Sequence, residues 1–285
     1  MTHQEIIDKI KAYHPKIDES VTCDGFKAGN PSDECTGIVT AIVPTIDAIE
    51  KTAELGANLL IVHEPTFYMT PDYTDWHTDF ENETVNEKKR LIEKYGITIW
   101  RDHDHMHAHK PDSIFTGVIK RLGWEDYMIE NVNVPMFFPF EIPEMTVGEM
   151  GRFLTDKFML NGLRFIGNPE DKLHKVAIIA HLCPGIFGAE GEDENGNYHD
   201  YATSIIKELE NGGYDAVIPG EIIEWNLLSY IRDSARLGRS KACFNVGHFS
   251  LEEPGMEYAA EWIRELVPEE IPVHYVRVEE IYSYI

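Results

Sequence analysis

Short apolar segments alternate with amphipathic segments along this chain, and this alternation restricts its fold more than any other feature. The run from Thr36 to Pro44 is apolar enough for a buried strand, and the segment after it predicts a helix that Thr45 caps and Gly56 ends. The apolar run from Asn58 to Val62 then predicts a second strand. Together these segments predict a β-α-β unit with parallel strands, which is typical of α/β proteins.

The same alternation continues, and 285 residues allow two packed α/β lobes with mixed sheets and helices on their faces. Three prolines interrupt the pattern between Glu130 and Pro143, so we predict a first lobe at 1–130 and a second at 131–285. The segment from about 241 to 285 is expected to return to the functional site. The other predicted helices pass through Ile6 to Ile10, 81–95, 147–158 and 201–211 and end near Leu122, and the other predicted strands are 97–101, one near Leu163, 175–180, 215–219 and 241–246.

The charge balance of the chain argues against several classes of partner. There are 50 acidic and 25 basic residues, and the formal net charge of −25 opposes binding to nucleic acid phosphates or anionic lipids. No apolar run approaches the ~20 residues that span a bilayer, and the first residues lack the apolar core of a secretory signal. The four cysteines are too scattered for a disulfide framework. We expect a cytoplasmic protein with no nucleic acid and no membrane as partner.

Histidines and carboxylates gather after three of the predicted strands. One strand is followed by His63 and Glu64, another by the histidine-rich run from Asp102 to His109, and a third by His248 and Glu252. Parallel strands bring their carboxyl ends to the edge where α/β sheets collect ligands. His248 and Glu252 are four residues apart and share a face if that stretch is helical. Imidazoles and carboxylates together suit zinc, manganese or iron, and a bridging carboxylate can hold two such cations ~3.5–4 Å apart.

Several other segments and side chains are predicted to have no direct role in the functional site. The Gly-rich stretch from Gly185 to Asp200 is predicted to be a mobile loop and not a phosphate cradle, and the aromatic segment from Pro135 to Phe140 is predicted to pack between the lobes and not in an oligomer interface. Several isolated side chains are predicted to be ordinary surface residues, namely His3, His14, His77, His174, His274, Arg101, Lys110 and Arg164.

Five motifs in this order resemble the Nif-three (NGG-interacting factor three) family, dinuclear-metal proteins often labelled GTP cyclohydrolase type 2 homologues. The resemblance covers most of the chain, and the most specific motif is GHFSLE, which stands for the family's Gly-His-x-x-x-Glu before the terminal helix. The others are DGFKAGN near the start, HEP where the family has His-His-Pro, RDHDHMH where it has His-Thr-Asn-Leu-Asp, and VIPGE from Val217 to Glu221.

This resemblance implies metal ligands at matching positions, with two exchanges. Glu64 stands where the family has a second histidine, and His107 stands where it has an aspartate. The exchange keeps four imidazoles and two carboxylates, so we predict that two divalent ions (Zn, Mn or Fe) are still bound. Glu64 is then a bridging ligand or, alternatively, the catalytic general base. The predicted ligands are His63, Glu64, His103, His107, His248 and Glu252.

Some alternatives remain open at this point. A different alignment uses Asp104 as the replacement carboxylate and leaves His105 or His109 as extra ligands or proton carriers. The leading functional interpretation is a dinuclear metal-dependent hydrolase, cyclohydrolase-like or amidohydrolase-like, that attacks a small C–N-containing metabolite with metal-activated water. The alternatives are a metal-handling or regulatory scaffold without catalysis and a binding protein with an empty site. The resemblance also implies a homo-oligomer, a trimer or a ring-shaped homohexamer.

Overall fold

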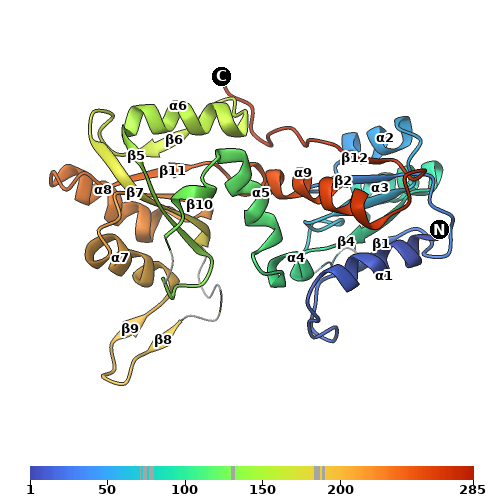
Figure 1. Ribbon diagram of the computed structural model, residues 1–285, viewed down its shortest axis with the longest axis horizontal. Helices are drawn as coiled ribbons and strands as arrows, with labels where there is room; N and C mark the ends of the chain where they lie inside the picture. Colours follow the sequence, from blue (N-terminus) through green and yellow to red (C-terminus); the bar gives the residue numbers. More distant parts are fainter. Residues whose placement is uncertain (71, 73–75, 77–79, 130–131, 183–186, 188–189) are drawn as a thin grey trace. The chain divides into compact units, whose positions relative to one another are not determined.

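The chain forms two compact units in a computed structural model that describes residues 1–285 except 71, 73–75, 77–79, 130–131, 183–186 and 188–189 (Figure 1). Unit 1 comprises Met1–Val118 and Glu252–Glu279, and unit 2 comprises Ile119–Leu251 and Glu280–Ile285. The predicted lobes, 1–130 and 131–285 with a segment from about 241 that returns to the functional site, stay a prediction. The predicted α/β fold class is confirmed.

Unit 1 is built on a five-stranded sheet in the order β1-β4-β3-β2-β12. The strands from β4 to β12 in this order run parallel, and β1 pairs antiparallel with β4, so the sheet is mixed. Every residue of β2, β3 and β4 is buried, which explains why these strands read as continuous apolar runs. The strands are β1 (Gly25–Ala28), β2 (Ile38–Ala41), β3 (Leu59–Val62), β4 (Thr98–Arg101) and β12 (Val273–Tyr275).

Helix α2 of unit 1 begins and ends where local sequence signals predict. The Thr45 side chain accepts a hydrogen bond from the Ala48 N–H at the start of α2, and Gly56 just beyond its end has a φ of +71°. Two of these helices, α5 and α9, cross from one unit into the other. The helices are α1 (His3–Tyr13), α2 (Ile46–Glu54), α3 (Glu83–Tyr95), α4 (Asp104–Ala108), α5 (Ser113–Leu122) and α9 (His248–Leu266).

Two glycines let α5 and α9 approach closely within unit 1. A Cβ atom at Gly117 would lie 2.4 Å from the Pro254 carbonyl oxygen, and one at Gly255 would lie 2.6 Å from Ile114 Cα. Neither position has space for a side chain, so the two backbones are held against each other. This contact positions the beginning of α9, which carries Glu252, beside the segment that leads into α5.

Unit 2 contains a second five-stranded sheet in the order β5-β7-β10-β11-β6, with helix α6 on one face and helices α7 and α8 on the other (Figure 1). The three central strands are parallel and the two edge strands are antiparallel to their neighbours. Alternate residues of the central strands pack against α7 and α8. The strands are β5 (Phe137–Thr146), β6 (Arg164–Ile166), β7 (Lys172–Leu182), β10 (Ala216–Ile222) and β11 (Ala242–Asn245), and the helices are η1 (Glu125–Tyr127), α6 (Val147–Phe158), α7 (Tyr201–Asn211), η3 (Glu224–Leu228) and α8 (Ser229–Arg236).

The structure of unit 2 differs from two predictions made from the sequence, one for the aromatic segment and one for the Gly-rich stretch. Phe137 and Phe140 are buried against Tyr214 and Trp124 of the same unit, so the aromatic segment is an edge strand of this core and not packing between lobes. Part of the predicted mobile loop is a short antiparallel hairpin of β8 (Gly191–Glu192) and β9 (Tyr198–His199). The rest of that prediction falls partly on 185–186 and 188–189, which lie outside the described residues.

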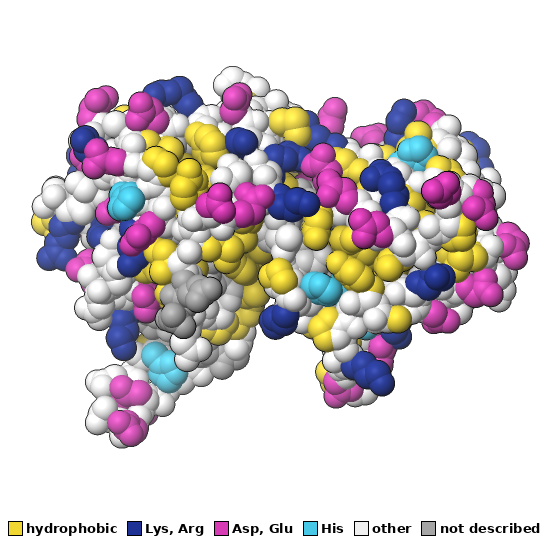
Figure 2. All heavy atoms as spheres, in the orientation of Figure 1, with side chains coloured by type: hydrophobic (Ala, Val, Ile, Leu, Met, Phe, Trp, Pro, Cys, Tyr) yellow, Lys and Arg dark blue, Asp and Glu magenta, His cyan; other side chains and the backbone are white. Residues whose placement is uncertain are grey.

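The described helices include none that is long and apolar enough to cross a membrane. On the face drawn in Figure 2, acidic and basic side chains are interspersed with uncharged ones. Three cysteines, Cys23, Cys35 and Cys243, are free thiols, and Cys183 lies outside the described residues.

Candidate metal centre

The parallel pairing of β3 and β4 brings two of the predicted histidine-bearing segments together. Val62 at the end of β3 is in register with Arg101 at the end of β4, and the Asp102 N–H donates to the Val62 carbonyl oxygen at 2.8 Å. The residues that follow, His63 and His103, therefore leave the sheet at the same edge. Their rings stack with centroids 4.5 Å apart.

Five side chains of unit 1 converge at this edge. The donor atoms of His63, His103 and His107 lie within 4.8 Å of one another, and so do those of His63, Glu64 and Glu252. His63 belongs to both groups, and its Nε2 lies 3.4 Å from Glu252 Oε2. His63 and Glu252 are completely buried. We call these five residues the His63 cluster.

The hydrogen bonds behind the three imidazoles orient them as metal ligands. His63 Nδ1 donates to the Asp102 carbonyl oxygen at 3.1 Å, His103 Nδ1 donates to Asp104 Oδ1 at 2.7 Å, and His107 Nδ1 donates to Asp112 Oδ2 at 2.9 Å. Each ring is thus fixed in the tautomer whose Nε2 carries the lone pair. His63 Nε2 is buried and makes no hydrogen bond to any described residue. Three such rings with two carboxylates fit a divalent cation of the zinc, manganese or iron type.

Asp24 holds the histidine-rich segment in place. Its Oδ1 accepts the backbone N–H groups of His103 and Asp104 at 2.7 and 2.9 Å, and its Oδ2 accepts the N–H and Nδ1–H of His105 at 2.9 and 2.5 Å. A carboxylate distant in sequence thereby satisfies the free N–H groups at the start of α4. Burial acts to raise the pKa of the Asp24 carboxyl, but these hydrogen bonds outweigh it and the net pKa is lowered.

The pKa values of two ligand imidazoles move in opposite directions. Burial, followed by the neighbouring His63, lowers the pKa of His103. Burial also acts to lower the pKa of His107, but the hydrogen bond to Asp112 outweighs it and the net pKa is raised. Asp112 also accepts the Phe115 N–H at 3.0 Å, so one carboxylate both orients His107 and caps the start of α5.

Arg101 is a buried partner of the cluster and not the surface cation that we predict from sequence. Its Nε donates to the His63 carbonyl oxygen at 2.9 Å, its Nη1 lies 3.2 Å from Asp72 Oδ2, and its Nη2 lies 3.7 Å from Glu64 Oε2. The side chain can be buried because these oxygens surround it. Lys110 and Arg164, the other two candidate cations, are exposed as predicted.

The remaining residues of the histidine-rich run serve other contacts. Asp104 orients His103, which makes it a supporting residue there, although its oxygens also lie within 4.8 Å of donor atoms of Cys23 and His103. His105 is bound by Asp24, and His109 Nδ1 lies 3.2 Å from His14 Nδ1.

The sixth predicted ligand, His248, is the first residue of α9, so the condition under which it shares a face with Glu252 is met. Its donor atoms, however, lie within 4.8 Å of those of His181 and Glu221, both in unit 2. Sequence reasoning named Glu221 only within the VIPGE motif and did not name His181, although both stand near the ends of predicted strands, which is the signal that identified His63.

Two histidines that we interpret from sequence as surface residues are buried. His3 contacts the Asn30 carbonyl oxygen and Asn58 Oδ1, at 3.2 and 3.1 Å. His14 Nε2 lies 3.7 Å from Asp102 Oδ2. Their partners are distant in sequence, which is why isolated positions suggest surface residues. His174 is exposed, His274 is partly exposed, and His77 lies outside the described residues.

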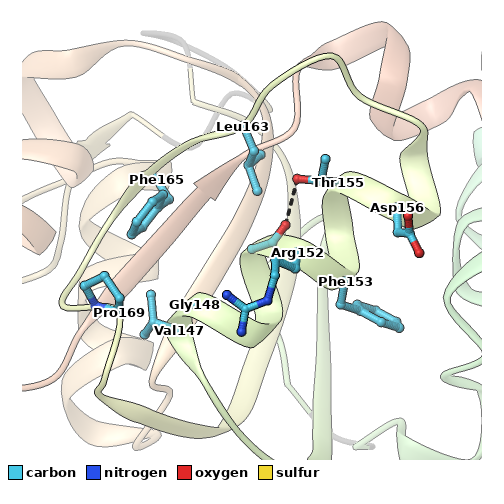
Figure 3. Close-up of a pocket in the computed structure, with 10 residues that line it drawn as sticks. Val147, Gly148, Arg152, Phe153, Thr155, Asp156, Leu163, Phe165 and Pro169 are labelled. Carbon is cyan, nitrogen blue, oxygen red and sulfur yellow. Dashed lines mark hydrogen bonds between the residues drawn. The ribbon is translucent and has the colours of Figure 1, made fainter.

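A pocket of about 770 Å³ in unit 2 lies between α6 and the segment around β6 (Figure 3). Leu163 and Phe165 face the helix across it, and the Thr155 hydroxyl donates to the Gly151 carbonyl oxygen on the helix side. Its lining includes Arg152 and Asp156 but no histidine. Because convergent polar groups mark a binding site better than volume does, we assign no function to this pocket.

The burial of Lys88 in α3 can be tested through the pH dependence of protein stability. This side chain is buried, its Nζ donates to the Thr66 carbonyl oxygen at 2.6 Å, and burial lowers its pKa to about 8. Between that pKa and the value of the unfolded chain, ~10.4, unfolding takes up a proton. The free energy of unfolding should therefore rise with pH across this window, by about 1.4 kcal/mol per unit relative to Lys88→Met. Urea unfolding of both proteins from pH 7.5 to 9.5 measures this, and parallel pH dependences would contradict it.

Comparison with known proteins places these observations in a family context. Residues 1–182 match the family model described as Duf34/NIF3 (NGG1p interacting factor 3). A GTP cyclohydrolase 1 type 2 homolog of Clostridium acetobutylicum is 22% identical over 81% of this chain and 78% of its own length. Its counterpart in Clostridium perfringens is 21% identical over 95% of this chain and 94% of its own. In structure, a Bacillus cereus protein related to NIF3 matches with a TM-score of 0.71 at 14% identity, over 100% of this chain and 99% of that one, which supports the fold alone.

Proposed function

Because this chain belongs to the Duf34/NIF3 (NGG1p interacting factor 3) family, we propose that it is a dinuclear metal-dependent hydrolase acting on a small C–N-containing metabolite. The observation that carries the proposal is the His63 cluster, in which three oriented imidazoles and two carboxylates converge on one edge of the mixed sheet of unit 1. Divalent cations held there would supply a water of lowered pKa and positive charge next to the developing anion.

The protein's own groups have separate tasks in this proposal. His63, His103 and His107 would hold the cations through Nε2 while their Nδ1–H groups stay engaged. Glu252 lies against His63 and adds negative charge. Glu64 has two oxygens, so it can contact Arg101 through one and bind a cation or accept a proton through the other.

The substrate class that we propose depends on which basic side chains near the site could bind a phosphate. A nucleotide needs basic groups for its phosphates, and Arg101 is committed to the His63 carbonyl oxygen, Asp72 and Glu64. The two relatives are named as homologs of a GTP cyclohydrolase, and from that name we carry over the hydrolysis but not the nucleotide. A small cyclic amide, urea or amidine therefore fits the proposal better than a triphosphate.

The alternative, a metal-handling scaffold, rests on histidines in excess of the ligand set. The contacts of His105 with Asp24 and of His109 with His14 give both residues other partners. A carrier should exchange its metal readily and hydrolyse nothing, whereas the enzyme should retain its metal and turn over a substrate. The oligomeric state stays a prediction, which the mass of the native protein in solution would test.

Metal analysis of the purified protein should find about two divalent ions per chain. Glu64→Ala should lower this to about one and reduce hydrolysis of a panel of amides, cyclic ureas and amidines by at least about 100-fold. Glu50→Ala, at an exposed position of α2, is the matched control and should change neither. A Glu64→Ala protein that keeps both ions but loses turnover would assign Glu64 as the general base. Retention of both ions and activity would contradict either role.

A further inference from the structure

A small cavity of unit 2 lies between the edge strand β6 and the helical segments η3 and α8. Its volume is about 200 Å³, below the ~300–1,000 Å³ of pockets that hold drug-sized ligands, so its ligand must be small. Among the described residues, three charged side chains line it, those of Arg164, Glu224 and Arg232. We propose that this cavity binds a small dicarboxylate that carries one ammonium group, the chemical class of the acidic amino acids.

The second sheet supplies one wall of the cavity. β6 pairs antiparallel with β11, and Arg164 is directly opposite Asn245. Two positions along each strand, Ile166 is directly opposite Cys243. Cross-strand partners and residues two apart on one strand point to the same face, so all four side chains share it. This is the face that α7 and α8 cover, because Cys243 belongs to the same core as Leu228 and Ile166 packs against that core.

The helical segments η3 and α8 supply the opposite wall. Glu224 and Leu228 are the first and last residues of η3, and Arg232 follows on α8 four residues after Leu228, on the same side. η3 is a π-helix that is interrupted at Asn226, where φ is −105° and ψ is −108°. The Ser229 hydroxyl donates to the Glu224 carbonyl oxygen at 2.8 Å, which ties Glu224 to the start of α8. Short π-helices of this kind occur frequently at functional sites.

The polar side chains around this cavity have hydrogen-bonding groups to spare. Those of Arg164, Glu224 and Asn245 make no hydrogen bond or ion pair with any residue that the structure describes. Arg232 Nε lies 3.3 Å from Asp233 Oδ1, which leaves its two terminal nitrogens available. A guanidinium binds a carboxylate through two parallel N–H bonds, and the amide of Asn245 can donate a further one. The three charged side chains are exposed, so a ligand can reach them from solvent.

The charges of the lining define the class of ligand. Two guanidinium groups and one carboxylate leave a net charge of about +1, which a ligand with two carboxylates and one ammonium complements group by group. A phosphate would be repelled by Glu224, and a monocarboxylate would leave one guanidinium unmatched. The inner part of the cavity is uncharged, because burial raises the pKa of the Cys243 thiol to about 12. The methylene groups of the ligand can therefore lie against Ile166, Leu228 and Cys243.

Isothermal titration calorimetry of the full-length protein with L-glutamate tests the inference, and one ligand should bind per chain. L-norvaline lacks the second carboxylate and glutarate lacks the ammonium, so each should bind at least about 10-fold more weakly than L-glutamate. Arg164→Ala and Arg232→Ala should each lower the affinity for L-glutamate by at least about 10-fold. Glu224→Gln should do the same but leave the affinity for glutarate no lower, because glutarate offers no ammonium to Glu224.

Matched controls keep the charge changes but place them outside the cavity. Arg152→Ala removes an exposed arginine from α6, on the other face of the sheet, and Glu192→Gln removes an exposed carboxylate from β8. Neither should change the affinity for L-glutamate. The substituted side chains of the cavity are exposed as well, so the variants should fold, and circular dichroism of each one checks this.

The outcomes separate this inference from the proposed hydrolase. A carboxylate ligand could also bind to cations at the His63 cluster, but His103→Ala/His107→Ala should bind L-glutamate with unchanged affinity if the cavity of unit 2 is the site. The inference is overturned if neither L-glutamate nor L-aspartate binds, or if Arg164→Ala and Arg232→Ala leave the affinity unchanged. It is also overturned if glutarate binds as tightly as L-glutamate, because Glu224 would then recognise no ammonium.

Discussion

His107→Ala should weaken zinc binding at the His63 cluster by at least about 100-fold, because it removes a ligand that neighbouring groups hold in a fixed orientation. The ring of His107 lies 4.9 Å from that of His63 and 4.8 Å from that of His103, and Asp112 fixes its tautomer. Competition with a chromophoric chelator measures the affinity, and turnover on the substrate panel should fall in parallel.

A graded series makes this prediction sharper. Asp112→Asn leaves the imidazole but weakens the hydrogen bond that orients it, so the affinity should fall by roughly 10–100-fold, less than for His107→Ala. His109→Ala, in the same histidine-rich run but outside the cluster, is the matched control and should keep normal affinity. Equal losses in His107→Ala and His109→Ala would mean that the segment matters only as a whole, which would contradict the assignment of His107 as a ligand.

Asp24→Ala should reduce the free energy of unfolding by about 3–5 kcal/mol, because it leaves several buried donors without their charged acceptor. The donors are the backbone N–H groups of His103, Asp104 and His105 and the His105 ring. Urea unfolding measures the loss, and zinc affinity should fall too, since these N–H groups fix the segment that carries His103.

Asp8→Ala, at an exposed position of α1, is the control for this loss and should change the free energy of unfolding by no more than about 0.5 kcal/mol. Asp24→Asn keeps the shape of the side chain but offers one acceptor oxygen and no charge, so it should fall between the two. An Asp24→Ala protein as stable as Asp8→Ala would show that water replaces the carboxylate at little cost.

Most elements of the fold could be predicted because their signals are local. The apolar runs at β2, β3 and β4 are buried throughout, and the caps at Thr45 and Gly56 depend on residues a few positions away. β1 and β12 were not predicted, since both are short strands at the edges of the sheet and exist only because partners distant in sequence pair with them. Local patterns carry no information about such partners.

The same difference explains which site residues could be found. His63, Glu64 and His103 follow strand ends, a feature visible in sequence, and the structure brings them together. The supporting groups could not be found in this way, because their partners are distant in sequence. Asp24 and His105, which share a hydrogen bond, are some eighty residues apart, and Arg101 and Asp72 are about thirty residues apart. The i to i+4 spacing places His248 and Glu252 on one face only if the stretch is helical, a condition that α9 meets, but it could not say which donors His248 contacts. That depends on how β7 and β10 end.

The position of Glu252 along the chain has a consequence for synthesis on the ribosome. His63, His103 and His107 emerge early, but Glu252 and the strand β12, which pairs with β2 in unit 1, follow the whole of Ile119–Leu251. Domains usually fold in the order in which they are made. Here the second unit is almost complete before the first can add the last strand of its sheet, so a nascent chain contains the three imidazoles and Glu64 long before it contains Glu252. Metal loading of the His63 cluster should accordingly be a late event, completed only after Glu252 has been synthesised.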